Sequence, residues 1–212
     1  MRQITGTMEA WAMAHGPAEQ GSAAPEEPLP PDGETTHGSG APSAADWLLG
    51  ATESRDRSRT EWQAHGVTML MAGVVFSAIR MSARLIQAAA GTDDIKDVDH
   101  YLTRALVGGP VIHDPRRCRY YALVPADSRH PWEPTRDLEP LGPGAYVGVP
   151  RPGLNAPTGS GASYWAVPMT VAGTLCAPSV VAVLVEIGRY RLASQPPVAD
   201  DQVSPLPMRG HR

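Results

Sequence analysis

Glycine and proline are spread unevenly along this chain, and their distribution limits where a folded core can form. Together they make up 43 of the 212 residues, about a fifth, against a usual share of roughly 12%. Residues 1–42 hold six of each, with six acids, one basic residue and almost no aliphatic side chains. Such a segment cannot bury enough apolar surface to offset the entropy cost of ordering it. We therefore predict a disordered acidic arm over residues 1–42.

Residues 195–212 carry four further prolines and no apolar periodicity, which predicts a second disordered tail. The segment between the tails, residues 43–194, has the size of one ordinary domain and is long enough to bury a core. Its 15 basic and 14 acidic residues nearly cancel, so it has no strong overall field to attract nucleic acid. The net charge of −4 therefore comes mostly from the arm.

Several residue counts exclude whole classes of protein. The only lysine, Lys96, follows Ile95, which excludes a phosphate-binding G-x-x-x-x-G-K-[ST] loop. Two cysteines, Cys118 and Cys176, are too few for a disulfide framework or a Cys-rich zinc module, and we expect reduced thiols in a cytoplasmic protein. No uncharged apolar run approaches the ~20 residues that a membrane helix needs, so we expect no membrane partner.

Hydrophobic periodicity and turn residues predict an α+β fold for the domain. Expected helices cover residues 46–50, 54–65, 82–90, 93–106 and 178–192, and expected strands cover residues 67–72, 74–79, 111–113, 119–124, 145–149 and 163–167. Residues 126–143 and 151–162 are expected to form long loops. The last helix should bury a stripe of Val181, Leu184, Val185, Ile187 and Leu192. Because the elements come in runs, we expect a mixed or mostly antiparallel sheet with helices packed on it.

Several strand-like motifs follow one another in an order known from one protein family. They are Gly66-Val-Thr-Met-Leu70, Val74–Ile79, Gly109-Pro-Val-Ile112, Arg116-Arg-Cys-Arg-Tyr-Tyr-Ala-Leu-Val-Pro125, Leu141-Gly-Pro-Gly-Ala-Tyr-Val-Gly-Val-Pro150 and Tyr164-Trp165. Together they resemble the N-terminal (prim-pol) domain of bifunctional DNA primase/polymerases, in the archaeo-eukaryotic primase superfamily. The resemblance covers about residues 44–192 and points to the divergent versions found in high-GC bacteria, which fits 17 arginines against one lysine. It implies a primase/polymerase-like fold.

The resemblance also implies where an active site would lie, and the sequence departs from the family there. Active members end one strand in paired acids that hold divalent metal for phosphoryl transfer. The corresponding segment here, Phe76-Ser77-Ala78-Ile79-Arg80, has no carboxylate. Arg119 replaces a phosphate-contacting His, and Glu139, near Asp137, stands at the third acid. We therefore expect Ser77, Arg119 and Glu139 to form a degenerate site without metal, and we expect no primer synthesis.

Residues 116–121 combine bases and aromatic residues, as proteins that bind single-stranded nucleic acid do. The candidate contacts are Arg116, Arg117, Arg119 and Tyr121, together with Arg80. Strand alternation would place Arg117, Arg119 and Tyr121 on one face. The structural alternative is a turn with exposed arginines that leads into a buried strand.

Three other groups invite a functional interpretation. Asp97 and Asp99 form an Asp-x-Asp pair, but on a helix they point about 200° apart, so we expect solvated helix charges rather than metal ligands. His113, followed by Asp114, is either an acid/base pair or the end of a strand. The aromatic residues beside the long loops either line a groove or cover the core; they are Trp132, Trp165 and Tyr146.

Three functions remain open at this point. The first is a catalytically degenerate primase/polymerase-like module that binds single-stranded DNA, a nucleotide or a protein partner, without a cofactor. The second is a structural or interaction protein that docks a partner through residues 1–42 or forms an oligomer. The third is an unconventional enzyme that uses Asp137, Glu139 and His113 with Mg²⁺ or Mn²⁺.

Overall fold

A computed structural model describes residues 42–159 and 161–194. Apart from Pro42, the predicted arm over residues 1–42 and the tail over residues 195–212 lie outside these ranges. The described helices are α1 Ala44–Leu48, α2 Arg55–His65, α3 Ala83–Ala90, α4 Ile95–Ala105 and α5 Pro178–Ser194, with 3₁₀ turns η1 Leu49–Ala51 and η2 Pro115–Arg117. The strands are β1 Val67–Met71, β2 Ser77–Ser82, β3 Val111–Asp114, β4 Arg119–Val124, β5 Leu138–Leu141, β6 Tyr146–Pro150 and β7 Tyr164–Val167. The fold is α+β, as predicted.

Helix ends follow the capping residues in the sequence. The Ser82 hydroxyl accepts from the backbone N–H of Leu85 at the start of α3, and the Asp94 carboxylate accepts from the backbone N–H groups of Lys96 and Asp97 at the start of α4. These side chains satisfy N–H groups that have no partner within the helix. Gly66 and Gly91 end α2 and α3 in the left-handed conformation that glycine tolerates best. The local sequence therefore sets where these helices begin or end.

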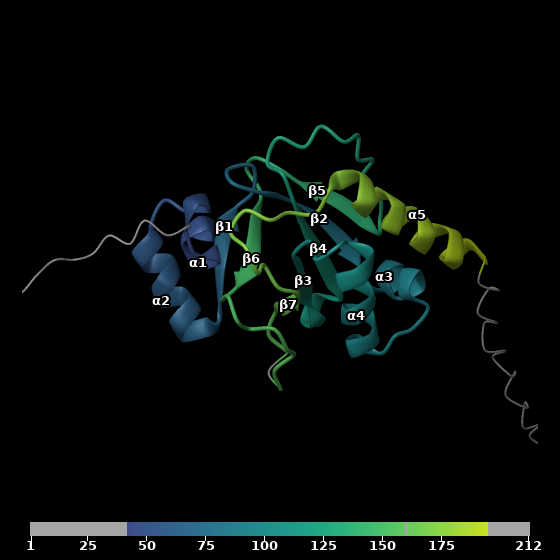
Figure 1. Ribbon diagram of the computed structural model, residues 1–212, viewed down its shortest axis with the longest axis horizontal. Helices are drawn as coiled ribbons and strands as arrows, with labels where there is room; N and C mark the ends of the chain where they lie inside the picture. Colours follow the sequence, from purple (N-terminus) through teal and green to yellow (C-terminus); the bar gives the residue numbers. More distant parts are fainter. Residues whose placement is uncertain (1–41, 160, 195–212) are drawn as a thin grey trace, which may run out of the picture. The chain divides into compact units, whose positions relative to one another are not determined.

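The strands form two antiparallel sheets (Figure 1). A five-stranded sheet has the order β5-β2-β4-β3-β7, and a two-stranded ribbon pairs β1 with β6. The prediction of a mostly antiparallel sheet is confirmed, and every described strand pair is antiparallel.

Three sequence predictions need correction. Strand β5 lies within the segment 126–143, which the sequence predicts to be a loop. The strand has only four residues, three of them half-buried and one of them Pro140, so its apolar signal is weak. Strand β2 begins at Ser77 rather than Val74 and continues through Arg80 to Ser82. On α5, Ile187 is 37% exposed, and Gly188 takes the buried place beside Leu184 and Val185.

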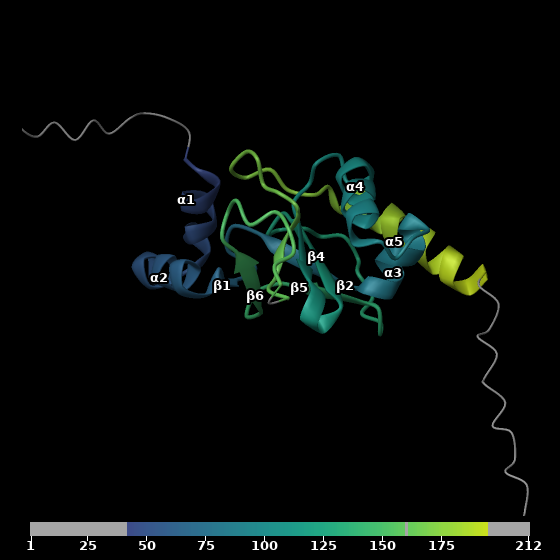
Figure 2. The ribbon, with the colours of Figure 1, turned by 90° about the horizontal axis from the view of Figure 1, so that it is seen from below.

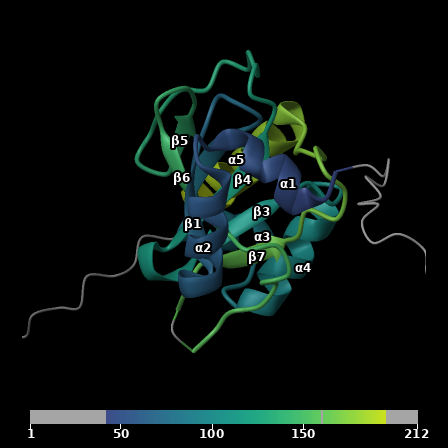
Figure 3. The ribbon, with the colours of Figure 1, turned by 90° about the vertical axis from the view of Figure 1, so that its left-hand side faces the viewer.

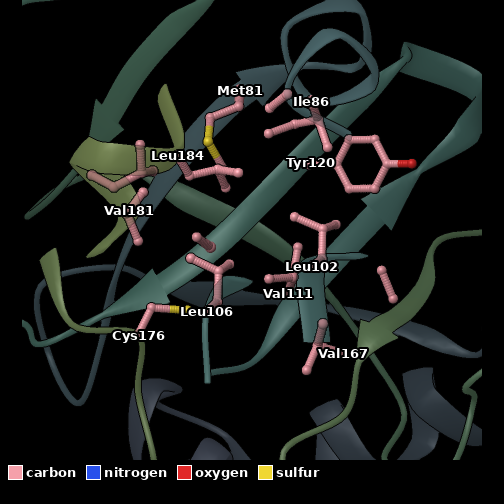
Figure 4. Packing of buried hydrophobic residues seen from close by; sticks show 14 of the residues in the cluster. Met81, Ile86, Leu102, Leu106, Val111, Tyr120, Val167, Cys176, Val181 and Leu184 are labelled. Atoms are coloured by element: carbon pink, nitrogen blue, oxygen red, sulfur yellow. The ribbon is translucent and has the colours of Figure 1, made fainter. Parts of the chain in front are cut away.

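Each face of the five-stranded sheet is covered by different elements. Helices α3, α4 and α5 pack on one face, the helix face; Figure 4 shows its side chains, among them Met81, Tyr120 and Leu184. The other face packs partly against η1, α1, α2 and the β1–β6 ribbon, through Leu49, Trp62 and Leu70 among others. Figures 2 and 3 show α3–α5 and α1–α2 on opposite sides of the sheet.

None of the helices in the described part of the chain has the length and apolar character needed to span a membrane.

Candidate functional site

Alternation along β4 separates its side chains between the two faces of the sheet. Tyr120, Ala122 and Val124 belong to the core of the helix face, whereas Leu123 belongs to the core on the other side. Because side chains alternate along a strand, Arg119 and Tyr121 share the face of Leu123. The prediction that Arg117, Arg119 and Tyr121 share one strand face is correct for Arg119 and Tyr121. It is wrong for Arg117, which precedes the strand, in η2.

Strand register gathers the candidate residues in two neighbouring rows on this face. One row across the sheet runs Glu139, Arg80, Tyr121 and Ile112 through β5, β2, β4 and β3. The next row runs Ser82, Arg119 and Asp114. Directly opposite residues of neighbouring strands have side chains on the same face, close together. We call these two rows and Arg117 the open-face cluster. Its buried members are Ile112, Ser82 and Asp114, and the others are partly or fully exposed.

Most of the charged side chains in the open-face cluster form ion pairs with one another. Arg80 pairs with Glu139, and Arg117 Nη1 lies 3.1 Å from Asp114 Oδ2. Next to them, the Arg84 guanidinium donates two hydrogen bonds to the Asp137 carboxylate, from Nη2 at 2.6 Å and from Nε at 2.8 Å. Arg119 forms no ion pair with any residue in the described ranges, although it lies opposite Asp114 in the register. Within the open-face cluster, Arg119 is therefore the guanidinium that can bind an external anion without giving up an ion pair.

Tyr121 lies at the centre of the open-face cluster. Its ring is half-buried, and burial is the main cause that raises the pKa of its hydroxyl, followed by the negative charge of Asp114. Arg80, Arg117 and Arg119 each act in the opposite direction. The register places Arg80 directly opposite Tyr121, and Arg119 lies two residues before it on the same strand.

A hollow beside the cluster is lined by Arg80, Ser82, Arg119 and residues 135–139. The Ser82 hydroxyl donates to Asp137 Oδ1 at 2.6 Å on its rim. The hydrogen bonds from Arg84, helped by Ser82, lower the pKa of Asp137 to about 2. Asp137 therefore stays ionised at neutral pH on this wall.

The positions expected for a degenerate catalytic site do not all meet. Arg119 and Glu139 both flank Arg80, but Ser77 pairs with Val124 at the far end of β2. Ser77 alternates with Ala78, which puts it on the helix face, and its hydroxyl donates to the carbonyl of Ala126 at 3.2 Å. Ser77 is therefore no part of the open-face cluster.

Arg116 also differs from its neighbours. It lies in η2 with its side chain beside Gly161, and it is not among the charges that act on Tyr121. The cluster therefore includes four of the five predicted contact residues.

The three residues proposed for an unconventional metal site are also apart. Glu139 and Asp137 are paired with arginines on the open face, whereas His113 stacks on Tyr120 of the helix-face core, with ring centroids 4.0 Å apart. Within residues 42–159 and 161–194, no three His, Cys, Asp or Glu side chains gather as a metal site would require. The described residues therefore offer no metal centre at Asp137, Glu139 and His113.

A buried polar chain links α4, β7 and β3, and sequence reasoning did not predict it. Tyr164 donates to Asp99 Oδ2 at 2.8 Å, and His113 Nδ1 lies 3.1 Å from the Tyr164 hydroxyl. Because Tyr164 gives its only proton to Asp99, His113 can bond to it only as a donor from Nδ1. Burial raises the pKa of Asp99 to about 6 and lowers the pKa of His113 to about 4.

Asp99 is thus not the fully solvated helix charge that the sequence predicts. Asp97 is exposed, but Asp99 is half-buried and its Oδ1 has no hydrogen-bond partner among the described residues. His113 and Tyr164 are both buried, so a substrate could not reach this chain without displacing core side chains. We assign it to the core rather than to a site.

The aromatic residues beside the long loops do not share a groove. Trp165 is buried, and its Nε1 donates to the carbonyl of Pro150 at 3.1 Å. Tyr146 is exposed beside Met69 and Met71, and Trp132 packs near α5. Of the two alternatives that the sequence left open, a groove or a place over the core, the second is correct for Trp165.

Comparisons with family models, with curated proteins and with solved structures return no match to this chain. Functional inference therefore rests on the geometry of the open-face cluster.

Proposed function

We propose that the open-face cluster binds the phosphate groups of single-stranded DNA or of a nucleotide, as a non-catalytic module. The observation that supports this proposal most strongly is the strand register, which places Arg80 opposite Tyr121, with Arg119 two residues before Tyr121 on the same face of the sheet. Guanidinium groups match the geometry of phosphate oxygens, and a tyrosine among them offers a surface on which a base can stack.

The presence or absence of an ion pair at Arg80, Arg117 and Arg119 indicates what each one would contribute to phosphate binding. Arg119 has no ion pair to exchange among the described residues, so it would make the first phosphate contact. Arg80 and Arg117 are held in place by Glu139 and Asp114, which orders their side chains and lowers the entropy cost of binding. Since the domain is nearly neutral overall, attraction would be short-ranged and sensitive to salt.

We further propose that the chain is a divergent member of the primase/polymerase group whose site has lost catalysis. The meeting of Arg119 and Glu139 at Arg80 supports this kinship, and the distant position of Ser77 counts against a site of the family's form. The open-face cluster has only guanidinium-paired carboxylates, whereas metal-dependent phosphoryl transfer needs carboxylates free to hold cations. We expect no nucleotide incorporation in a primer-synthesis assay with Mg²⁺ or Mn²⁺, and any incorporation would contradict this proposal.

Fluorescence anisotropy with a labelled oligothymidine tests the binding proposal. We expect Arg119→Ala to weaken binding about 5- to 10-fold at low salt and to reduce the slope of log affinity against log salt by about 1, because one phosphate contact is lost. Arg55→Ala is the matched control, since Arg55 is an exposed arginine at the start of α2. Competition by a nucleoside triphosphate distinguishes a nucleotide site from a strand site.

Two outcomes would contradict the binding proposal. One is that neither the oligothymidine nor the nucleotide binds to the protein at low salt. The other is equal weakening by Arg119→Ala and Arg55→Ala, which would indicate attraction to the whole surface rather than to the cluster.

A further inference from the structure

Strand β1 is paired along one edge only. At the two ends of the β1–β6 ladder, the Gly66 carbonyl accepts from the N–H of Arg151 at 2.8 Å, and the N–H of Ala72 donates to the carbonyl of Ala145 at 2.9 Å. Hydrogen-bonded and non-bonded pairs alternate along an antiparallel ladder. The even-numbered residues of β1 therefore direct their backbone groups toward β6, and residues 67, 69 and 71 direct theirs the opposite way. We call these outward N–H and C=O groups the β1 edge.

No residue in the described ranges forms a hydrogen bond with the β1 edge. A row of unpaired donors and acceptors on a strand is a template for one more strand. In both Figure 1 and Figure 2, β1 lies between α2 and β6. The neighbour of β1 on the side of this edge is therefore a helix, which offers no ladder of its own.

A hollow of about 300 Å³ lies beside β1. Met69 and Met71 form one wall together with Tyr146 of β6, and residues 51–54 with the first two turns of α2 form the other. The space between the strand and the helix is therefore not filled by side chains of the described part of the chain.

The side chains of the odd-numbered residues of β1 stand on the exposed face of the ribbon. Met69 is 52% exposed, and Tyr146, opposite Met71, is 56% exposed. A strand added at the β1 edge would place alternate side chains beside Met69 and Met71, because directly opposite residues of neighbouring strands share a face. Methionine side chains adapt to different apolar neighbours. Apolar residues at alternate positions of a ligand would therefore match this face.

Glu53 gives the hollow a charge that is not neutralised. Its carboxylate is exposed and forms no ion pair with residues 42–159 or 161–194. Glu61, by contrast, accepts from Arg57 at 3.0 Å and from the Thr68 hydroxyl. Because Arg57 and Glu61 balance each other, the charge that remains is negative, which favours a ligand with a basic side chain.

We propose that the β1 edge binds an extended peptide segment of a partner protein, which adds to the ribbon as a third strand. The segment has apolar side chains at alternate positions and a basic residue beside Glu53. Main-chain hydrogen bonds to residues 67, 69 and 71 supply affinity, and the hollow supplies specificity. Since η1 and α2 wall the hollow, one extended segment fits beside β1 more readily than the folded surface of a second copy does. This peptide site is separate from the open-face cluster and does not rest on the function proposed for it.

Backbone amide exchange followed by NMR on the full chain tests the added strand residue by residue. The probe is a synthetic peptide about eight residues long, in which valine and threonine alternate and a lysine stands at each end. Without peptide, we expect fast exchange at Met69 and Met71 and slow exchange at Thr68 and Leu70, whose N–H groups are bonded to β6. Peptide at about ten times its Kd should slow exchange at Met69 and Met71 by about 10-fold and leave Thr68 and Leu70 unchanged.

Substitutions at residue 69 test the backbone pairing. Met69→Pro removes an outward N–H and should weaken peptide binding by at least ~10-fold, because the carbonyl that would accept from it loses its donor. Proline is tolerated on a strand whose N–H faces away from the ladder, and circular dichroism checks that the fold is kept. Met69→Val is the matched control, since it keeps the N–H and an apolar side chain, and we expect less than ~3-fold change.

A charge reversal outside the strand tests the hollow without touching the ribbon. Glu53→Lys should weaken binding of the lysine-containing peptide by about 3- to 10-fold, because attraction becomes repulsion. Glu133→Lys is the matched control, since Glu133 is also an exposed carboxylate but lies near α5.

Three results would overturn the proposal or a part of it. Unchanged exchange at Met69 and Met71 with up to about 1 mM peptide would exclude the added strand. Equal weakening by Glu53→Lys and Glu133→Lys would remove the basic residue from its place beside Glu53. Protection of Met69 and Met71 that rises with protein concentration, without peptide, would show that a second copy covers the β1 edge instead of a peptide.

Discussion

Folding shifts the pKa values of two ionisable groups in the core in opposite directions. Burial raises the pKa of Asp99 to about 6 and lowers the pKa of His113 to about 4. Between these pH values folded Asp99 keeps a proton that the unfolded chain has released, whereas folded His113 lacks a proton that the unfolded chain has bound. Their contributions to the pH dependence of unfolding therefore oppose each other over this range.

Replacing Asp99 by asparagine should separate the two contributions. Asp99→Asn removes the cost of a buried carboxylate while keeping an oxygen that can accept from Tyr164. Since Asp99 is only partly buried, we expect a gain of about 1 kcal/mol in the free energy of unfolding near neutral pH. The gain should shrink as the pH falls through 6 and vanish near 4, where wild-type Asp99 is protonated in the folded state.

Urea unfolding of both proteins at a series of pH values measures this difference. Asp97→Asn is the control, because Asp97 is exposed on the same helix. A loss of stability in Asp99→Asn that grows as the pH rises through 6 would contradict this expectation and show that the ionised carboxylate stabilises the fold.

The sequence allowed some residues of the site to be predicted and not others. Alternation along residues 119–124 placed Arg119 and Tyr121 correctly, because strand periodicity is a local property. The bond from Tyr164 to Asp99 spans 65 positions in the chain. Helix periodicity shows only that Asp99 borders the Val98 and Leu102 stripe, so its partner depends on how α4 packs against β7.

Helices were easier to predict than strands, and the reason lies in their end signals. Glycines at 66 and 91 and capping side chains at 82 and 94 fix the helix boundaries within a few residues. Strand β5 carries no such signal, and it exists because β2 offers it a free edge. The same pairing brings Glu139 to Arg80, so the acidic half of the open-face cluster depends on a strand that local sequence does not specify.

Contact between α3 and α5 depends on the absence of a side chain at Gly188. An alanine there would collide with the carbonyl oxygen of Leu85, although alanine favours a helix by about 1 kcal/mol over glycine. Overpacking against backbone costs typically 1–3 kcal/mol and cannot be relieved by a rotamer change. We expect Gly188→Ala to lower the free energy of unfolding by about 1–2 kcal/mol.

Gly142→Ala is the matched control for this change. Nothing lies within 4 Å of the position that its Cβ would occupy, and its φ angle is not positive, so we expect stability to stay within about 0.5 kcal/mol of wild type. Thermal unfolding followed by circular dichroism measures both. A Gly188→Ala protein as stable as wild type would mean that the two helices separate at little cost.

At the scale of the whole domain, one five-stranded sheet separates two apolar cores. Neighbouring residues of β4 enter different cores, with Ala122 on the helix face and Leu123 on the other. A strand cannot leave one core without leaving the other, because its backbone is shared by both. The open-face cluster lies on this same sheet, so its geometry depends on both cores together.

Because the same strands belong to both cores, we expect a single unfolding transition that a substitution in either core shifts. Leu85→Ala on the helix face and Leu123→Ala on the other face should each cost about 2–5 kcal/mol, since both side chains are fully buried. Circular dichroism reports the helices, while Trp62 and Trp165, in the core with Leu123, contribute to the fluorescence signal. We expect Leu85→Ala to shift both urea transitions equally, although it lies on the face away from these tryptophans. A shift confined to circular dichroism would mean that the two sides unfold separately, and that the open-face cluster can persist without its helices.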